Sequence, residues 1–191
     1  MAGSRWRAGW AAAAVAAVVA AALAAPAGAT VIGQERYSGT DDFSFAECGT
    51  TFDVLGSFGG HVRFRVDRGG QAFYVTDAFS FEDVVTNRAT GKWFVVRGHG
   101  VFNEIKATLV SGNVYEFVAV EAGQPFVLED AEGNVIVRDR GVIRHRALFD
   151  TLGDGMPGAI LITEFEPVVH GPHPAFADDF PFCDIALGLT T

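Results

Sequence analysis

Asp77, Asp139 and His145 are the residues best placed for chemistry, because each stands where an alternating strand pattern calls for an apolar side chain. Asp77 interrupts the aromatic side of a predicted strand at 72–86, and the other two interrupt the apolar side of one at 135–149. A carboxyl group and an imidazole inside an apolar interior could transfer protons as acid and base, or anchor the polar group of a ligand. The alternative is a structural one, in which a strand bulge reverses the pattern or the residues form a buried pair.

Two short segments carry weaker signals for metal binding. Asp150 and Asp154 occupy the first and fifth positions of a pattern that resembles the start of a calcium loop, but leucine stands at the third position. His170 and His173 offer nitrogen donors in a proline-rich segment that lacks the spacing of zinc motifs. A turn and a solvated loop explain both segments, and we predict neither a metal nor a cofactor.

Strands must position all of these residues. Two-residue alternation, punctuated by turns rich in glycine and asparagine, predicts strands over 61–67, 72–86, 92–102, 104–110, 114–121, 126–129, 135–149 and 159–168. No stretch beyond residue 29 keeps a helical apolar pattern for ten residues. The pattern therefore predicts an all-β domain, a single antiparallel up-and-down β-barrel of about eight strands, with a β-sandwich as the alternative.

Aromatic residues dominate the side of these strands that we expect to face inward. The chain has 17 phenylalanines, and those expected to line the lumen are Phe73, Phe79, Phe81, Phe94 and Phe149. A barrel of about eight strands either packs its interior solid or holds a small ligand there. An aromatic lining suits both outcomes.

The first 29 residues have the features of a secretory signal peptide. Arg5 and Arg7 precede an apolar run over 10–25, and Ala27 and Ala29 supply the small-residue cleavage pattern. We expect cleavage after Ala29, export of residues 30–191 as one domain, and no membrane span after the signal is removed. An uncleaved membrane anchor is the alternative.

The two cysteines, Cys48 and Cys183, permit one intramolecular pairing. An exported chain meets an oxidising environment, so a disulfide is predicted and a pair of buried thiols is the alternative. The bond would join the two ends of the predicted strand region. We expect their Cα atoms to lie within about 7 Å, across the seam where the barrel closes.

The charge of the chain limits its partners. The full sequence has a net charge of −9, and residues 30–191 keep 12 basic and all 23 acidic residues, which gives −11. This excess of acid disfavours nucleic acid as a partner. We expect a monomer whose partner, if it has one, is a small apolar molecule.

Three sequence features together resemble a group of small exported proteins of actinobacteria to which no function is assigned. They are the segment 43–49 leading into a strand, the loop 150–158, and a lone cysteine close to the C-terminus. The resemblance covers most of residues 30–191 loosely. It implies export, the disulfide and a β-rich fold, and it brings no catalytic residue.

The sequence favours a secreted β-barrel protein that binds a small hydrophobic ligand in its lumen. One alternative is an isomerase or cyclase that uses Asp77, Asp139 and His145 inside the lumen. The other is a structural or surface-interaction protein with a solid core. A non-enzymatic role is favoured because no nucleophile motif or phosphate-binding loop is present.

Overall fold

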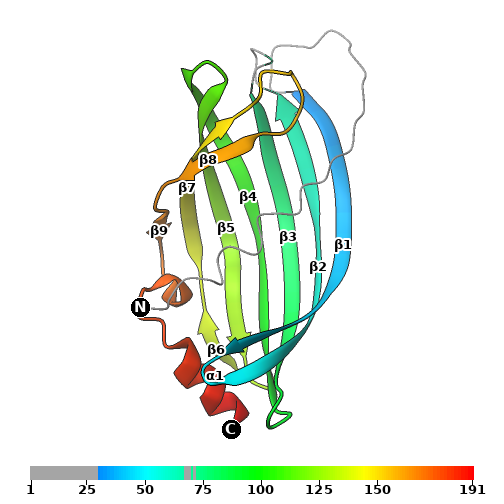
Figure 1. The fold of residues 1–191 in the computed structure, drawn as a ribbon, viewed down its shortest axis with the longest axis vertical. Helices are drawn as coiled ribbons and strands as arrows, with labels where there is room; N and C mark the ends of the chain where they lie inside the picture. The colour runs from blue at the N-terminus through cyan, green and yellow to red at the C-terminus, as the bar shows by residue number, and fades with distance from the viewer. Residues whose placement is uncertain (1–29, 67–69, 71) are drawn as a thin grey trace.

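A computed structural model describes residues 30–66, 70 and 72–191. The predicted signal peptide lies outside these residues. The described chain forms one antiparallel sheet, a short 3-10 helix and a C-terminal α-helix (Figure 1). The elements are β1 Thr30–Glu47, β2 Thr50–Val66, β3 Phe73–Asn87, β4 Trp93–Ser111, β5 Val114–Glu129, β6 Val135–Arg138, β7 Gly141–Asp150, β8 Ile160–Glu164, β9 Val168–His170, η2 Pro174–Phe176 and α1 Phe182–Thr190.

The strands follow one another in the sheet in the order β1, β2, β3, β4, β5, β7, β8. β6 and β7 pair with different parts of β5, and β9 pairs with β7. The all-β antiparallel prediction is confirmed. β1 and β8 lie at opposite ends of this order, and no ladder joins them in the described chain, so closure into a barrel is not confirmed.

Several predicted strand boundaries are wrong, in two opposite ways. The pair predicted at 92–102 and 104–110 is the single strand β4, and the pair at 114–121 and 126–129 is β5. Register shifts bend these long ladders without ending them. Conversely, the strand predicted at 135–149 is broken at residues 139 and 140, and the one at 159–168 gives β8 and, beyond it, β9.

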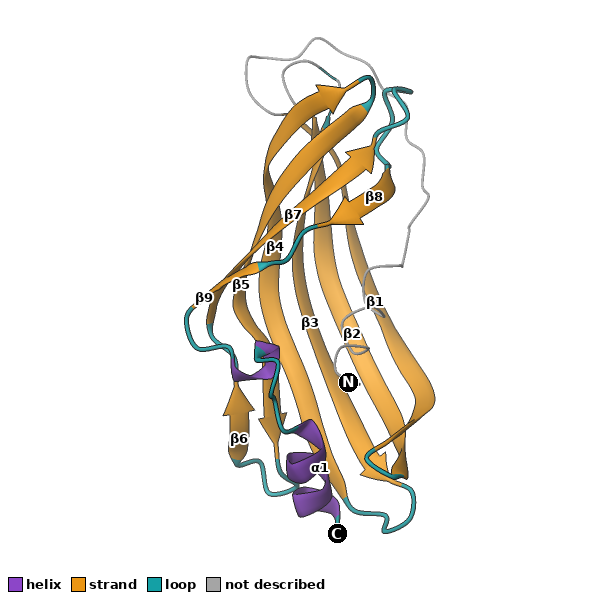
Figure 2. Ribbon diagram, turned by 60° about the vertical axis from the view of Figure 1, so that its left-hand side comes forward, coloured by secondary structure: helices purple, strands orange, loops and turns teal. Residues whose placement is uncertain are grey.

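Aromatic rings reach across to glycines on neighbouring strands, where a larger residue would not fit. A Cβ atom at Gly39 would stand 2.5 Å from the ring of Phe58, and one at Gly98 would stand 2.5 Å from the ring of Phe81. The ring of Phe79 covers Gly100 in the same way, at 3.2 Å. Glycine in a strand commonly marks close approach or bending, and the long strands curve strongly (Figures 1 and 2).

One face of the sheet, which we call the concave face, is the face against which α1 packs (Figure 2). Strand alternation and the pairing register place on it the odd-numbered residues of β3, the even-numbered residues of β2, and their register partners on β1, β4, β5 and β7. All five phenylalanines predicted to line a lumen lie on this face: Phe73, Phe79, Phe81, Phe94 and Phe149.

The main core fills the lower end of the concave face. Helix α1 packs there with Ala186 fully buried, and Phe182 meets Phe94 edge to face at a centroid distance of 6.3 Å. The buried strand residues of this cluster are Phe52, Val54, Val85, Phe94, Val96, Leu128 and Val137. Phe81 packs against the same cluster. This end of the sheet is therefore solid.

The predicted disulfide between Cys48 and Cys183 is present, with a Cα–Cα distance of 5.2 Å. Its predicted location at a closure seam is wrong, because Cys48 lies in the two-residue turn between β1 and β2 and Cys183 lies in α1. Cys48 and Gly49 have φ angles of 56° and 76°, the positive values that a tight hairpin turn of this type requires at both positions. The bond fastens α1 to this hairpin.

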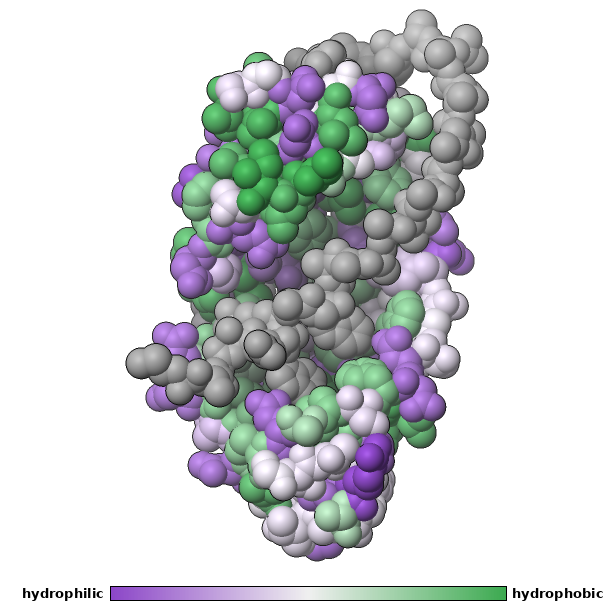
Figure 3. Space-filling view, viewed as in Figure 1, coloured by the Kyte–Doolittle hydropathy of each residue, from purple (hydrophilic) through white to green (hydrophobic). Residues whose placement is uncertain are grey.

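A smaller cluster closes the upper end of the concave face. Ala72, Tyr115 and Phe117 are buried there, and Phe149 meets Phe117 edge to face. Beyond it, exposed apolar side chains gather over β8 and appear as a green patch in Figure 3. The middle of the concave face thus lies between two packed ends, and Figure 3 shows the surface hollowed below the patch.

Candidate functional site

Ionisable and aromatic side chains meet in the middle of the concave face. We call this set the concave band and define it as Tyr37, Asp77, Phe79, Phe102, Glu121 and His145. All six side chains are half-buried, unlike the fully buried residues of the lower core. They come from β1, β3, β4, β5 and β7, so the band crosses the sheet from one side to the other.

Asp77 is held by a tyrosine that reaches across a whole strand. The Tyr37 hydroxyl on β1 donates a hydrogen bond of 2.7 Å to Asp77 Oδ2 on β3. Between them lies Gly60 of β2, where a Cβ atom would stand only 2.3 Å from the hydroxyl oxygen. Burial, followed by the hydrogen bond and the charge of Asp77, raises the pKa of Tyr37, so the phenol keeps its proton. Asp77 Oδ1 is buried without a partner among the described residues.

Replacing Gly60 by alanine is expected to break this bridge. The new methyl group would overlap the Tyr37 ring and the Ala78 carbonyl oxygen, which lies 2.7 Å from the Cβ position. We expect the free energy of unfolding to fall by about 2 kcal/mol, the typical cost of overpacking, in urea titrations.

Gly33→Ala is the matched control, because its Cβ would be in ordinary contact at 3.6 Å from the Phe64 ring. Equal losses in the two variants would contradict the bridge. Tyr37→Phe should cost about 1 kcal/mol, the net value of one hydrogen bond.

His145 is paired with a glutamate from the neighbouring strand. Its Nε2 lies 3.2 Å from Glu121 Oε2, and its ring lies 5.8 Å from the ring of Phe102. The His145 and Glu121 side chains are 35% and 19% exposed, so both are accessible from the concave side. A carboxylate that orients an imidazole is an arrangement suited to proton transfer or to holding a polar ligand group.

Asp139 has different partners from Asp77 and His145. It lies in the break between β6 and β7 and is fully buried, and its Oδ1 accepts the Ala175 backbone N–H at 3.0 Å. Its Oδ2 lies 3.8 Å from Nδ1 of the buried His173. The expected grouping of Asp77, Asp139 and His145 is therefore wrong: Asp139 fastens the C-terminal segment against the sheet.

A second acidic pair lies on the concave face nearer to α1. Asp83 is 3% exposed, and its carboxyl group lies over Gly56, with Asp41 on the other side of that glycine. Burial and, secondly, the charge of Asp41 raise the pKa of Asp83 to about 6. Two carboxyl groups are thus held close together in a place where water reaches one of them poorly.

Glu104 fills the place where β3 and β4 separate. The β3–β4 ladder ends at Thr76 and Asn103, and Glu104 Oε2 accepts the Val75 backbone N–H at 2.6 Å. Burial raises the pKa of Glu104 to about 7, while this hydrogen bond and the nearby Arg65 act in the opposite direction. The side chain replaces a missing rung of the ladder.

The residues considered for metal binding have other roles. Asp150 Oδ1 and Asp154 Oδ1 accept backbone N–H groups two residues ahead, at 2.8 and 2.9 Å, which is typical of turns. His170 is exposed in β9, whereas His173 is buried against Phe176. In the described ranges, three or more histidine, cysteine or acidic side chains are nowhere grouped as metal ligands.

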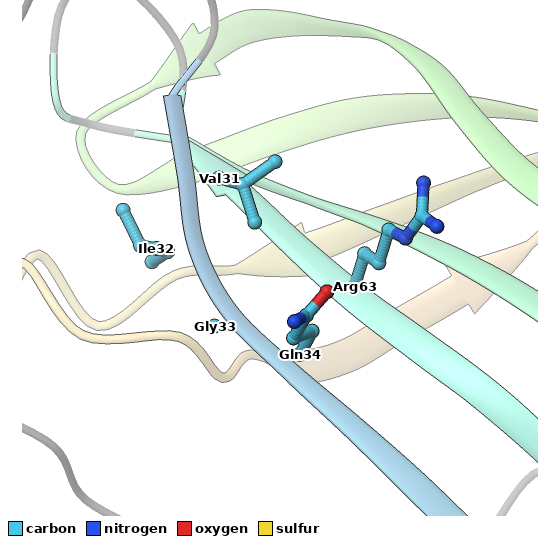
Figure 4. A pocket seen from close by; sticks show the side chains of 5 residues that line it. All are labelled: Val31, Ile32, Gly33, Gln34 and Arg63. Atoms are coloured by element: carbon cyan, nitrogen blue, oxygen red, sulfur yellow. The ribbon is translucent and has the colours of Figure 1, made fainter.

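A pocket of about 470 Å³ lies at the start of β1 (Figure 4). Its lining consists of Val31, Ile32, Gly33, Gln34 and Arg63. Gln34 and Arg63 are register partners and point to the same side in Figure 4. This pocket contains none of the paired groups of the concave band, so the band is the better candidate site.

Sequence reasoning missed Tyr37, Asp41 and Glu121. The first two lie on β1, a strand that was not predicted, although Tyr37, Asp41 and Phe45 share one alternation. Residues 48 and 49 give the hairpin signal that would have revealed it, since a two-residue turn ending in glycine commonly joins paired strands. Glu121 falls at the predicted end of a strand that in fact continues to Glu129.

In the part of the chain that the model covers, no helix has the length and apolar character needed to cross a membrane. Comparisons with protein-family models, with curated proteins and with solved structures found no match. The geometry of the concave band is therefore the main indication of function in this protein.

Proposed function

We propose that this chain is an exported protein that binds a small, mainly apolar ligand against the concave face of its sheet. The observation that carries the proposal is the concave band itself, in which half-buried aromatic rings accompany two oriented polar pairs between packed ends. Small-molecule sites typically combine an apolar lining with a few placed polar groups.

The disulfide supports the exported part of the proposal, because such bonds persist in oxidising compartments. Ligand binding does not depend on closure of the sheet into a barrel, since the band lies on one face of consecutive strands. The two polar pairs would fix the orientation of a ligand whose apolar part lies against Phe79 and Phe102.

The test is binding of an uncharged fluorescent probe, N-phenyl-1-naphthylamine, to the disulfide-bonded protein comprising residues 30–191. We expect saturable binding with one probe per chain, seen by fluorescence and as a 1:1 complex in native mass spectrometry. Phe102→Ala should weaken binding about tenfold, which corresponds to about 1.4 kcal/mol and to the loss of some 50 Å² of apolar contact.

Val101→Ala is the control, because Val101 is the neighbour of Phe102 on the opposite face and is 43% exposed. Absence of saturable binding by the unmodified protein would refute the proposal. Equal affinity of both variants would place the probe away from the concave band and would refute it as well.

A further inference from the structure

The concave face carries charge of one sign. Among the described residues of β1 to β5 and β7, its carboxyl groups are Glu35, Asp41, Glu47, Asp77, Asp83, Glu104 and Glu121, and its one basic side chain is His145. The lysines and arginines of the described strands β1 to β5 and β7 fall on the opposite alternation, as the ion pair between Arg146 and Glu116 illustrates. A ligand that enters this face meets aromatic rings and negative charge together.

The aromatic rings beside Asp83 diverge. Phe58 and Phe81 are direct register partners on β2 and β3, but Phe58 leans over Gly39 of β1 and Phe81 leans over Gly98 of β4. Each ring lies in close contact with a glycine on its outer side, so the two do not pack on each other. Two residues farther along the same face lie Asp83 on β3 and Asp41 on β1, on either side of Gly56 of β2.

Asp83 lacks a counter-charge. Its residue surface is only 3% exposed, and no other described residue forms a hydrogen bond to its carboxyl group. The charged group that acts on Asp83 is another carboxylate, that of Asp41, and burial, together with the charge of Asp41, raises the pKa of Asp83. A buried carboxyl group without a donor is costly, and a ligand of opposite charge would remove that cost.

The chemistry of the surroundings selects the kind of cation. Calcium requires six or more oxygen ligands, and the described chain groups no three acidic or histidine side chains as a metal site. An organic ammonium needs only one or two carboxylates, and its substituents and charge are both favoured by the faces of aromatic rings. Phe58, Phe81 and the acidic pair provide this combination.

We propose that the ligand of the concave face is a lipophilic cation, an amine or quaternary ammonium, with its charge at Asp41 and Asp83. Its apolar part extends past Phe58 and Phe81 to Phe79 and Phe102 of the concave band. This inference rests on the proposed function, since it names the chemical class of the ligand bound there. It separates this protein from carriers of neutral or acidic lipids.

The test compares three probes that share a phenylbutyl group: 4-phenylbutyltrimethylammonium, 4-phenylbutanol and 4-phenylbutyrate. Each displaces N-phenyl-1-naphthylamine from residues 30–191 at pH 8. We expect the ammonium compound to bind at least tenfold more tightly than the alcohol, and the carboxylate to bind most weakly. Asp83→Asn and Asp41→Asn should each lower the affinity for the ammonium compound about tenfold and leave that for the alcohol unchanged.

Glu82→Gln is the matched control, because Glu82 adjoins Asp83 in sequence but lies exposed on the opposite face. Equal affinity for the ammonium compound and the alcohol, or an unchanged ammonium affinity in both aspartate variants, would overturn the inference while leaving the proposed function intact. Absence of binding by the naphthylamine probe itself would instead refute the proposed function.

Discussion

Replacing both Cys48 and Cys183 by serine is expected to lower the free energy of unfolding by about 3 to 5 kcal/mol. The bond joins residues 135 positions apart, and the chain-entropy model gives about 5 kcal/mol for a closed loop of this length. Few single changes in a domain of this size have a larger effect, because total stability is typically about 5 to 15 kcal/mol.

Unfolding of the double serine variant should begin at the lower end of the sheet. The bond fastens α1 to the β1–β2 hairpin, and α1 covers Phe52, Val54 and Phe94, which are 0 to 1% exposed. At its other end α1 is attached through Thr190, whose hydroxyl accepts a hydrogen bond of 3.2 Å from Asn87. Without the disulfide, the hydrogen bonds from Asn87 and Thr90 to Thr190 and the apolar packing remain to hold the helix.

Urea unfolding of the oxidised protein, the reduced protein and the double serine variant provides the measurement. The reduced protein and the variant should agree with each other and differ from the oxidised form. Hydrogen exchange should show loss of protection first in α1 and later in β3 and β4. An unchanged urea midpoint, or uniform loss of protection across the sheet, would contradict the role assigned to this bond.

The sequence predicted the antiparallel all-β architecture and the disulfide, because strand alternation is a local signal and two cysteines permit one intramolecular pairing. Alternation with a period of two identified most of the strands, and two cysteines leave one pairing. The lengths of the strands were harder to predict. β4 and β5 continue through register shifts at Glu104 and Gln124, where side-chain alternation alone indicates an end.

The candidate site could be predicted only in part, since its pairs join strands distant in sequence. Parity correctly indicated that Asp77 and His145 share a face. Their partners depend on the register between strands: Tyr37 is 40 residues from Asp77, and Glu121 is 24 residues from His145. Asp139 shares the same alternation, but the break in the strand gives it other neighbours, and periodicity carries no signal of that break.

Raising the pH from 4.5 to 8 is expected to destabilise the protein through Asp83 and Glu104. Their pKa values rise on folding, from 3.8 to about 6 and from 4.5 to about 7. The folded state therefore binds protons more tightly than the unfolded state at these positions. Stability is greatest below the unfolded pKa values and falls as the pH rises through the folded ones. Each shift corresponds to about 3 kcal/mol at most, before any solvent screening of the charged form is taken into account.

Neutral isosteres isolate this effect. Asp83→Asn and Glu104→Gln should each raise the free energy of unfolding by about 2 kcal/mol at pH 8 and change it little at pH 4.5. Glutamine at 104 keeps an oxygen that can accept the Val75 N–H, so this hydrogen bond is retained. Glu82→Gln, at an exposed position, should show no such dependence on pH.

Urea titrations of the three variants and the unmodified protein at both pH values provide the comparison. A gain at pH 8 that persists unchanged at pH 4.5 would show that packing, and not ionisation, is responsible. A loss at pH 8 would show that the charged carboxylates are already compensated in the folded protein. For Asp83→Asn, we expect the protein to become more stable at pH 8 and to bind the ammonium compound more weakly. Both results together would show that Asp83 serves ligand binding and lowers the stability of the fold, since binding groups are commonly retained at a cost in stability.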